Sequence, residues 1–233
     1  MQIKLNERLL SVAKLVLPGQ MAADIGTDHS YLPVYLIVNG ICPSVIATEK
    51  AHGPFNNACQ LVELLSLNRH IDMRFGSGLT VLKPGEAATI TMAGMGGYVI
   101  RDILETSLEV AAASQRLVLQ PQKNGPMLRQ YLQGSGWCIV AEDIAFDHGF
   151  YYEVIAAEPG DMQLTEDETL FGPCLLAQPH PLLPQYLDLQ LADMQTLLDQ
   201  LEDKAGSEAE ERRAFLQYKI NKIVTILAAR NGG

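Results

Sequence analysis

Two periodicities of apolar residues alternate along the chain from residue 1 to 160. Short apolar or β-branched runs predict strands over 21–23, 44–48, 71–75, 87–92 and 116–119. Apolar residues at three- and four-residue steps predict intervening helices over 3–16, 30–39, 55–67, 98–106 and 127–133. Strands that alternate with helices are typical of an α/β fold with a mostly parallel sheet.

The pattern changes after residue 133, where two predicted strands follow each other over 137–145 and 151–157. Two successive strands predict that the final strand pairs antiparallel, which gives a mostly parallel sheet of seven strands. Ligands of such sheets bind at the carboxyl ends of the strands. In this sequence those ends are 24–29, 49, 76–78, 93–97 and 120–122.

Beyond residue 160 the alternation of strands and helices stops. A connector over 161–184 is acidic and rich in proline, and two helical seams with a break near Gly206 follow it. The seams predict an antiparallel helical hairpin. We expect one domain over 1–160 and a second part, the connector and hairpin, over 161–233. The seam residues are Leu187, Leu191, Met194, Leu198 and Leu201, and then Leu216, Ile220, Ile223 and Leu227.

Composition limits the classes of protein to which this chain can belong. Its 233 residues are 48% hydrophobic, which is enough for one sizeable core with an appendage. No apolar run approaches the roughly 18 to 20 residues of a membrane span, and charges from Lys4 onward interrupt any secretory signal. The four cysteines form no C-x-x-C motif, which favours free thiols in a reducing compartment over a zinc site. We therefore expect a cytoplasmic protein without a membrane or metal partner.

The net charge argues at first against a nucleic-acid partner. The formal charge is −10, whereas contacts with phosphates require a basic surface. The charge is uneven, however, because the segment from Arg212 onward contains no acid. Its basic residues are Arg212, Arg213, Lys219, Lys222 and Arg230.

The segment 21–36 carries the most informative chemistry. A short apolar run ends at Asp24, the chain turns at Gly26, and an apolar helical pattern begins near Ser30. This layout places a ligand over the exposed N–H groups of a helix start. Only one glycine lies in the turn, so the G-x-G-x-x-G motif of dinucleotide-binding proteins is absent. The turn suits a ligand without a pyrophosphate, such as the positively charged S-adenosylmethionine.

Each acidic residue at these strand ends has two possible interpretations, a functional role and a structural one. Asp24 could bind an amine or accept from loop N–H groups, or it could only cap the turn. Glu49 could bind both ribose hydroxyls of an adenosine, or it could be a solvated acid beside Lys50. Asp28 and His29 could form an N-cap pair or bind a metal. A metal-dependent hydrolase that uses Asp28 and His29 is therefore the second hypothesis. The remaining histidines follow no metal-binding pattern, which makes this hypothesis the weaker one.

Glycines gather at the end of the predicted fourth strand, in Ala93-Gly94-Met95-Gly96-Gly97. Glycine costs conformational entropy on folding, so we interpret this loop as a close approach of the backbone to a ligand or a flat base. A merely flexible loop is the alternative. The segment 120–122, Gln-Pro-Gln, could bind a ligand or be an ordinary turn.

Together these segments resemble the class I S-adenosylmethionine-dependent methyltransferases, and specifically the bacterial family that methylates N1 of adenine 22 in tRNA. The specific part is the pair D-I-G-T-D-H-S-Y-L-P at 24–33 and A-G-M-G-G at 93–97, and the resemblance covers nearly the whole chain. Supporting motifs are G-P at 53–54, G-S-G-L at 76–79, L-Q-P at 119–121, L-R at 128–129, Y-E at 152–153 and L-F-G-P at 170–173.

The resemblance implies a Rossmann-like domain that binds S-adenosylmethionine, and a C-terminal coiled-coil domain that assists tRNA binding. Ser77 stands where many methyltransferases place an aspartate that accepts from the cofactor's adenine amine. Gln122 replaces the asparagine of the family's L-Q-P-N. The implied cofactor-binding residues are Asp24, Gly26, Asp28, His29, Tyr31, Leu32, Glu49, Gly76, Ser77, Ala93, Gly94 and Met95.

For this reaction we expect catalysis mainly by positioning, because neutral adenine carries an in-plane lone pair on N1. N1 lies on the Watson–Crick edge, so the base must be unpaired or extruded. Asp28 is the candidate to stabilise charge that develops on the ring, with Met95 or Tyr31 against the base face. Gln120 and Gln122 are candidates to read the base edge. Candidate substrate-binding residues are Met95, Gly96, Lys123, Arg129, Arg212, Arg213, Lys219 and Lys222.

Two other functions stay open from the sequence. An RNA-binding or adaptor protein without catalysis would explain Ser77, and a methyltransferase could act on a small molecule or a protein instead of tRNA. The sequence also leaves the oligomeric state open, and a monomer is compatible with it.

Overall fold

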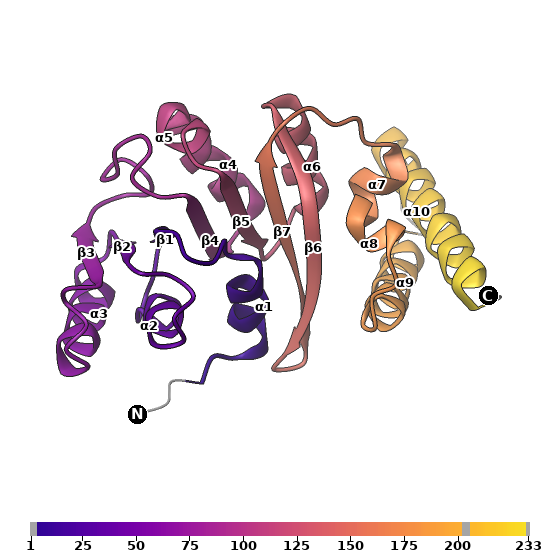
Figure 1. Cartoon of the computed structure of the whole chain (residues 1–233). Helices are drawn as coiled ribbons and strands as arrows, with labels where there is room; N and C mark the ends of the chain where they lie inside the picture. Colours follow the sequence, from indigo (N-terminus) through magenta and orange to yellow (C-terminus); the bar gives the residue numbers. More distant parts are fainter. Residues whose placement is uncertain (1–3, 202–205, 232–233) are drawn as a thin grey trace. The chain divides into compact units, whose positions relative to one another are not determined.

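The structure, a computed structural model, describes residues 4–201 and 206–231, except for the side chains of Arg230 and Asn231. The chain divides into two compact units, residues 1–178 and 179–233 (Figure 1). The first unit therefore extends past the boundary that we predicted at residue 160, and it includes most of the predicted connector.

The strands of the first unit form one seven-stranded sheet. They are β1 (Ala22–Ile25), β2 (Val45–Glu49), β3 (Ile71–Phe75), β4 (Thr89–Met95), β5 (Arg116–Pro121), β6 (Trp137–Asp147) and β7 (Phe150–Pro159). Their order is β3-β2-β1-β4-β5-β7-β6 (Figure 1). Strands β1 to β5 pair in parallel, and β7 pairs antiparallel with β5 and β6. The predicted mostly parallel sheet with an antiparallel final strand is confirmed.

Helices cover both faces of this sheet. They are α1 (Glu7–Leu15), α2 (Tyr31–Val38), α3 (His52–Leu64), α4 (Gly97–Thr106), α5 (Leu108–Ala112) and α6 (Gly125–Gly134). Successive side chains of a strand point to opposite faces. In β5, Leu117 and Leu119 pack in the core beside α4 and α6, whereas Val118 packs with α1 and α2. Because both faces are buried, the strands form continuous apolar runs in the sequence.

The helix starts differ from the predicted ones for local reasons. Helix α1 begins at Glu7 because the Asn6 side chain accepts a hydrogen bond from the Leu9 N–H at 3.0 Å and caps the helix. The predicted start at Ile3 lies outside the described residues. Helix α3 begins at His52, before the predicted start at residue 55, and the short helix α5 was not predicted.

The predicted connector contains two short helices, α7 (Glu166–Phe171) and α8 (Pro173–Ala177). Thr165 and Glu168 form a capping box at the start of α7. Phe171 and Leu175 are buried, and the Cys174 N–H donates to Glu142 of β6 at 2.9 Å. These contacts explain why this segment belongs to the first unit.

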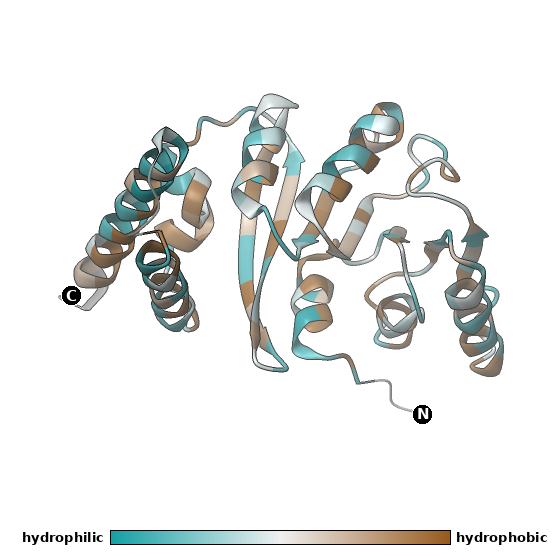
Figure 2. Cartoon of the chain, turned by 180° about the vertical axis from the view of Figure 1, so that it is seen from behind, coloured by the Kyte–Doolittle hydropathy of each residue, from teal (hydrophilic) through white to brown (hydrophobic). Residues whose placement is uncertain are grey.

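The second unit contains the predicted helical hairpin, built from α9 (Leu183–Asp199) and α10 (Ser207–Asn231). Apolar and polar residues occur side by side along each helix (Figure 2). The seam residues Leu187 and Met194 of α9, and Leu216, Ile220 and Ile223 of α10, are buried. Although α10 has 25 residues, neither it nor any other helix of the described ranges is long and apolar enough to cross a membrane.

Candidate functional site

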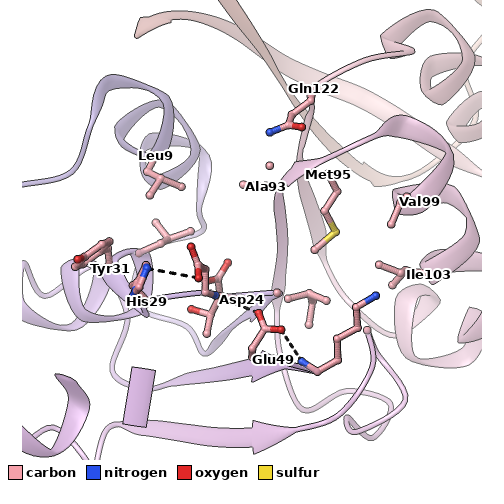
Figure 3. A pocket seen from close by; sticks show the side chains of 18 of the residues that line it. Leu9, Asp24, His29, Tyr31, Glu49, Ala93, Met95, Val99, Ile103 and Gln122 are labelled. Carbon is pink, nitrogen blue, oxygen red and sulfur yellow. Dashed lines mark hydrogen bonds and ion pairs between the residues drawn. The ribbon is translucent and has the colours of Figure 1, made fainter. Parts of the chain in front are cut away.

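A cavity of about 650 Å³ opens at the carboxyl ends of β1 to β4. Asp24 and Glu49 lie in it, with Leu9 and Tyr31 to one side and Met95 to the other (Figure 3). Every residue that the sequence predicted for cofactor binding lines this single cavity: Asp24, Gly26, Asp28, His29, Tyr31, Leu32, Glu49, Gly76, Ser77, Ala93, Gly94 and Met95. Together with Gln122, which also lines the cavity, they show that five segments far apart in the sequence converge on one edge of the sheet.

The turn after β1 is fixed to β2 by the backbone. The N–H groups of Gly26 and Thr27 both donate to the Thr48 carbonyl at 2.9 Å. Gly26 has a φ of +72°, a conformation that favours glycine, and a Cβ at this position would clash with the Cε of Met95. The positive φ therefore favours glycine at this position, and the end of the Met95 side chain would have to move to admit a Cβ.

Asp24 is a buried carboxyl group in the cavity wall. Its side chain is hydrogen-bonded by the Thr91 hydroxyl at 2.7 Å, and the residue is 5% exposed. Burial raises the pKa of Asp24, and the Thr91 hydroxyl and the charge of Arg8 oppose this effect. A carboxylate held in this way gains most from a cationic ligand, which would favour its charged form.

Glu49 is oriented by the backbone that follows it. Its Oε1 accepts from the N–H groups of Lys50 and Ala51, each at 2.8 Å, and its Oε2 lies 3.4 Å from the Asp28 N. The residue is 9% exposed, so the alternative of a solvated acid is wrong. One carboxylate oxygen is occupied by short hydrogen bonds, and the other can accept from hydroxyl groups of a ligand.

Asp28 and His29 lie at the rim of the cavity. Their side chains are 66% and 45% exposed, and the His29 Nε2 lies 3.6 Å from the Asp28 Oδ1. They are not an N-cap pair, because Ser30 occupies the cap position of α2. Among the described residues, no group of three His, Cys, Asp or Glu side chains could hold a metal ion. The site therefore gives no support to the hydrolase hypothesis.

The glycine loop after β4 is held in place by neighbouring segments, so the flexible-loop alternative is wrong. The Gly94 N–H donates to the Gln120 Oε1 at 3.0 Å, and the Gly97 N–H donates to the Lys123 carbonyl at 2.9 Å. A Cβ at Gly97 would lie 2.8 Å from the Asn124 carbonyl oxygen, a distance that side chains do not tolerate. This glycine is required by a close approach of two backbone segments.

Gln120 does not read a base edge, contrary to our prediction. Its side chain is fully buried and does not line the cavity, and its Oε1 accepts from both Gly94 N and Arg8 Nη1. Gln120 lies within β5 and its side chain points toward Arg8 of α1, whereas Gln122 follows the end of the strand and lines the cavity. Gln120 instead supports the glycine loop.

Arg129 cannot bind a tRNA phosphate, which also corrects the prediction. Its side chain has no exposed surface, and it pairs with Glu142 at 2.8 Å and with Glu153 at 3.3 Å. Burial raises the pKa of Glu142, and the charge of Arg129 opposes this. These three residues join α6 to β6 and β7, so the L-R and Y-E motifs serve the fold.

The other predicted substrate-binding residues lie outside the cavity lining, apart from Met95. Gly96 is half-buried and Lys123 is exposed after β5. On α10, Arg212 is exposed and the Arg213 Nη1 donates to the Leu201 carbonyl at 2.7 Å. Lys219 and Lys222 lie 5.7 and 5.4 Å from the ring centres of Phe215 and Tyr218, and the side chain of Arg230 lies outside the described residues.

Helix α1 contributes residues that the sequence did not reveal. Asn6, Arg8 and Leu9 line the cavity. The sequence predicted only an amphipathic helix here, and its polar residues gave no signal that distinguished a cavity wall from a solvated face. Lys50, Val99 and Ile103 also line the cavity without having been predicted.

Comparisons with known proteins agree with this site. The profile of the TrmK family, described as tRNA (adenine(22)-N(1))-methyltransferase, matches residues 22–225. A Bacillus subtilis protein named tRNA (adenine(22)-N(1))-methyltransferase is 36% identical over 218 residues, which cover 91% of this chain and 92% of the relative.

Solved structures give the same result. The crystal structure of the B. subtilis m1A22 tRNA methyltransferase TrmK has a TM-score of 0.87 and 33% identity, and the match covers 97% of this chain and 100% of that one. Streptococcus pneumoniae Sp1610 in complex with S-adenosyl-L-methionine has a TM-score of 0.87 and 35% identity, over 96% of this chain and 100% of that one. The chain therefore belongs to the tRNA (adenine(22)-N(1))-methyltransferase family.

Proposed function

We propose that this chain transfers a methyl group from S-adenosylmethionine to N1 of adenine 22 in tRNA. The observation that carries the proposal is the convergence of Asp24, Glu49 and the glycine loop 93–97 on one cavity of a class I sheet. Family membership supports the choice of tRNA as substrate.

The residues of the cavity fit this cofactor. Its volume of about 650 Å³ lies within the range of about 300–1,000 Å³ found for small-molecule sites. Glu49 would accept from the ribose hydroxyls with its Oε2, and the buried Asp24 would bind the cationic amine. Val99 and Ile103 of α4 add an apolar wall that suits a purine ring, which can explain why Ser77 suffices without an aspartate.

The chain's contribution to the reaction is mainly geometric. S-adenosylmethionine supplies a methyl group on a positively charged sulfur. No residue needs to remove a proton from N1, and alignment of reacting groups can contribute roughly 7 to 11 kcal/mol. The Gly94 to Gly97 loop, fixed by Gln120 and Lys123, would hold the extruded adenine. Asp28 at the rim would stabilise positive charge on the ring.

Two regions would contact the rest of the tRNA. Lys123 is exposed directly after β5, close in sequence to the cavity residue Gln122. Helix α10 carries Arg212, Lys219 and Lys222, and no acid follows Arg212. Positive side chains on such a helix would bind phosphates of the tRNA. Because the substrate is a tRNA, we infer that the enzyme acts in the cytoplasm.

Nucleoside analysis tests the function directly. An unmodified tRNA transcript with adenine at position 22 is incubated with the chain and labelled S-adenosylmethionine, then digested to nucleosides. We expect label in 1-methyladenosine, and none when the same transcript carries guanine at position 22. Label in another nucleoside, or label that ignores the substitution, would refute the assigned position.

Calorimetry separates an enzyme from a non-catalytic adaptor. We expect saturable binding of S-adenosylmethionine to the free chain. An RNA-binding adaptor without a working pocket would bind tRNA but give no saturable heat with the cofactor.

A further inference from the structure

The hairpin of β6 and β7 extends beyond the neighbouring strand at the carboxyl edge of the sheet. Strand β5 ends at Pro121, and its pairing with β7 places Leu119 opposite Ile155. The hairpin continues past Ile155 to a turn at 148–149, and Figure 1 shows its lower end beyond the end of β5, beside α1. Residues 146–151, the β6–β7 tip, therefore project from the edge that carries the cavity.

A two-residue turn gives the β6–β7 tip a defined conformation. The turn at 148–149 connects the paired residues Asp147 and Phe150, and its two residues have positive φ values of 48° and 86°. Two successive residues with positive φ are typical of a type I′ turn, whose twist matches that of the flanking strands. On one face of the tip, Phe146 and Tyr151 pack with their ring centres 4.7 Å apart.

The other face of the hairpin is fixed to α1, which forms a wall of the cavity. The Asn6 Nδ2 donates to the Asp147 Oδ2 at 2.9 Å, and the Ser11 hydroxyl donates to Asp143 at 2.7 Å. Asn6 also lines the cavity. Asp147 and Phe150 are directly opposed, so they point to the same face, with Cβ atoms about 4.5–5.5 Å apart. Phe150 therefore lies beside a residue that contacts the cavity wall.

The ring of Phe150 is exposed at this position. The residue is 65% exposed, more than any other phenylalanine or tyrosine of the described ranges. Within residues 4–201 and 206–231 it packs against no other aromatic ring. Single exposed apolar residues are common on protein surfaces, so the informative feature is its location. A flat ring stands beside the cavity wall at the end of a fixed hairpin.

The charges around Phe150 are compatible with RNA. The carboxylates within 146–153 belong to Asp147 and Glu153, whose side chains are 11% and 10% exposed. Asp147 accepts from Asn6, and Glu153 pairs with Arg129. Lys123 is exposed in the turn after β5, the strand next to β7. Sites for single-stranded nucleic acid combine aromatic rings, on which bases stack, with cations that bind phosphates.

The transfer of a methyl group to adenine 22 creates a need for such a ring. N1 can reach the cofactor only when the base leaves its stack. The neighbouring base then loses a stacking partner, and an aromatic side chain can replace that partner. This neighbouring nucleotide must lie at the mouth of the cavity, next to the α1 wall to which the β6–β7 tip is fixed.

We propose that Phe150 stacks on a nucleotide next to adenine 22 and replaces the stacking lost when the adenine enters the cavity. This inference rests on the proposed function. It makes Phe150 an RNA-binding residue of the first unit, with a role separate from the phosphate contacts of α10.

The first test measures tRNA affinity in the presence of S-adenosylhomocysteine, so that no transfer occurs. Phe150→Leu keeps an apolar side chain but removes the flat ring. Its tRNA affinity should fall at least about fivefold, the lower limit for the loss of one stacked base, whereas Phe150→Trp should bind as tightly as the wild type. Because stacking involves no phosphate, the slope of log affinity against log salt should stay unchanged in Phe150→Leu. Affinity for S-adenosylmethionine should also stay unchanged.

A fluorescent base reports the stacking itself. The base 2-aminopurine, placed at either neighbour of adenine 22, is dim when it is stacked and bright when it is unstacked. At saturating wild-type protein with S-adenosylhomocysteine, one of the two labelled tRNAs should stay dim. The same tRNA should become brighter at saturating Phe150→Leu. A purely structural role of Phe150 would not change this signal at saturation.

Phe146→Leu is the matched control. Phe146 belongs to the same β6–β7 tip and is 46% exposed, but it pairs with Tyr151 on the face away from α1. The control should keep the wild-type tRNA affinity. Thermal melts of each variant without ligand show whether the fold is retained. If Phe150→Leu does not fold, Phe150→Trp carries the test, because tRNA should quench its fluorescence more than that of the wild type.

The outcomes separate this inference from the proposed function. A folded Phe150→Leu variant that keeps wild-type tRNA affinity, or in which neither labelled base becomes brighter, overturns the stacking role. An equal loss of affinity in Phe146→Leu also overturns it. Loss of self-association in Phe150→Leu with unchanged tRNA binding would assign the tip to an interface between copies of the chain instead. A wild-type chain that transfers no methyl group to adenine 22 refutes the proposed function itself.

Discussion

Individual side chains at the carboxyl edge have roles that depend on whether they face the cavity or the core. Asp24 and Glu49 are both largely buried, but Glu49 is satisfied by backbone N–H groups, whereas burial raises the pKa of Asp24. Such a carboxyl group is costly in the free protein and becomes favourable when a cation binds. Binding sites commonly contain groups of this kind.

Replacing Asp24 with asparagine should therefore separate stability from binding. Because its pKa is raised in the folded state, the ionised carboxylate costs stability, and this cost appears as the pH rises from about 3.9, the value of an ordinary aspartate, through the raised value. We expect Asp24→Asn to melt at or above the wild-type temperature at pH 7, with the difference vanishing near pH 4. Its affinity for S-adenosylmethionine should fall roughly tenfold or more.

Thermal melts between pH 4 and 8 and calorimetry check this prediction. Thr91 can still donate to the asparagine oxygen, so the fold keeps that hydrogen bond. A lower melting temperature for Asp24→Asn at pH 7 would contradict the assigned cost of ionisation.

Gln120 and Gln122 form a matched pair two residues apart. Gln120→Ala removes the acceptor of the Gly94 N–H and the Arg8 guanidinium group, which should cost about 1–3 kcal/mol in the free energy of unfolding. Gln122→Ala removes an exposed side chain and should cost less than about 0.5 kcal/mol. Urea unfolding measures both values. Equal costs would show that Gln120 does not support the loop.

Elements at this edge are positioned by backbone contacts between loops. The β4–α4 junction lies against the turn after β5, and the backbone hydrogen bonds Gly97 N–H to Lys123 carbonyl and Gln122 N–H to Met95 carbonyl connect the two. Steric contact requires glycine only at Gly97, where the two backbone segments approach most closely. Gly96 has space for a side chain, and Gly94 has a positive φ of +78°, which favours glycine.

Gly97 and Gly96 should therefore respond differently to alanine. A Cβ at Gly97 would lie 2.8 Å from a backbone oxygen, whereas nothing lies within 4 Å of a Cβ at Gly96. We expect Gly97→Ala to destabilise the fold by about 1–3 kcal/mol, as overpacking does, and Gly96→Ala to fold with nearly wild-type stability. Thermal and urea unfolding decide the matter. A tolerated Gly97→Ala would mean that the two loops can separate without cost.

At the scale of the whole molecule, acidic and basic character are separated along the chain. The formal charge is −10, yet the segment after Glu211 contains only basic charges. On α10, Lys219 and Lys222 pack along aromatic rings of their own helix, which orders their stems without removing their charge. Such a helix can bind a polyanion that the remainder of the chain would repel.

Reversing charges on α10 tests whether its basic residues bind tRNA. In the double variant Arg212→Glu, Lys222→Glu, tRNA affinity at low salt should fall at least tenfold, and the slope of log affinity against log salt should decrease by roughly 0.7–0.9 per lost phosphate contact. Affinity for S-adenosylmethionine should not change. The control is Lys14→Glu, Lys83→Glu, which alters exposed lysines of the first unit by the same charge. Equal loss of tRNA affinity in the control would show that only net charge matters.

The sequence by itself determined the strands, most of the helices, the hairpin and the loops that form the cavity. These features follow from local periodicity, from glycine positions and from the burial of strands on both faces, all of which neighbouring residues encode. The motifs at 24–33 and 93–97 indicated the family, and the cofactor-site residues that this resemblance implied all line the cavity.

Only the tertiary structure decided which polar side chains line the cavity. Gln120 and Arg129 looked like ligand-binding residues, but the packing of β5 and α6 buries them with partners distant in sequence. No prediction singled out Arg8, but α1 packs so that this residue lines the cavity. Whether a polar residue supports the fold or binds a ligand depends on neighbours that are distant in the sequence. The periodicity of a sequence reports only local structure and does not identify those neighbours.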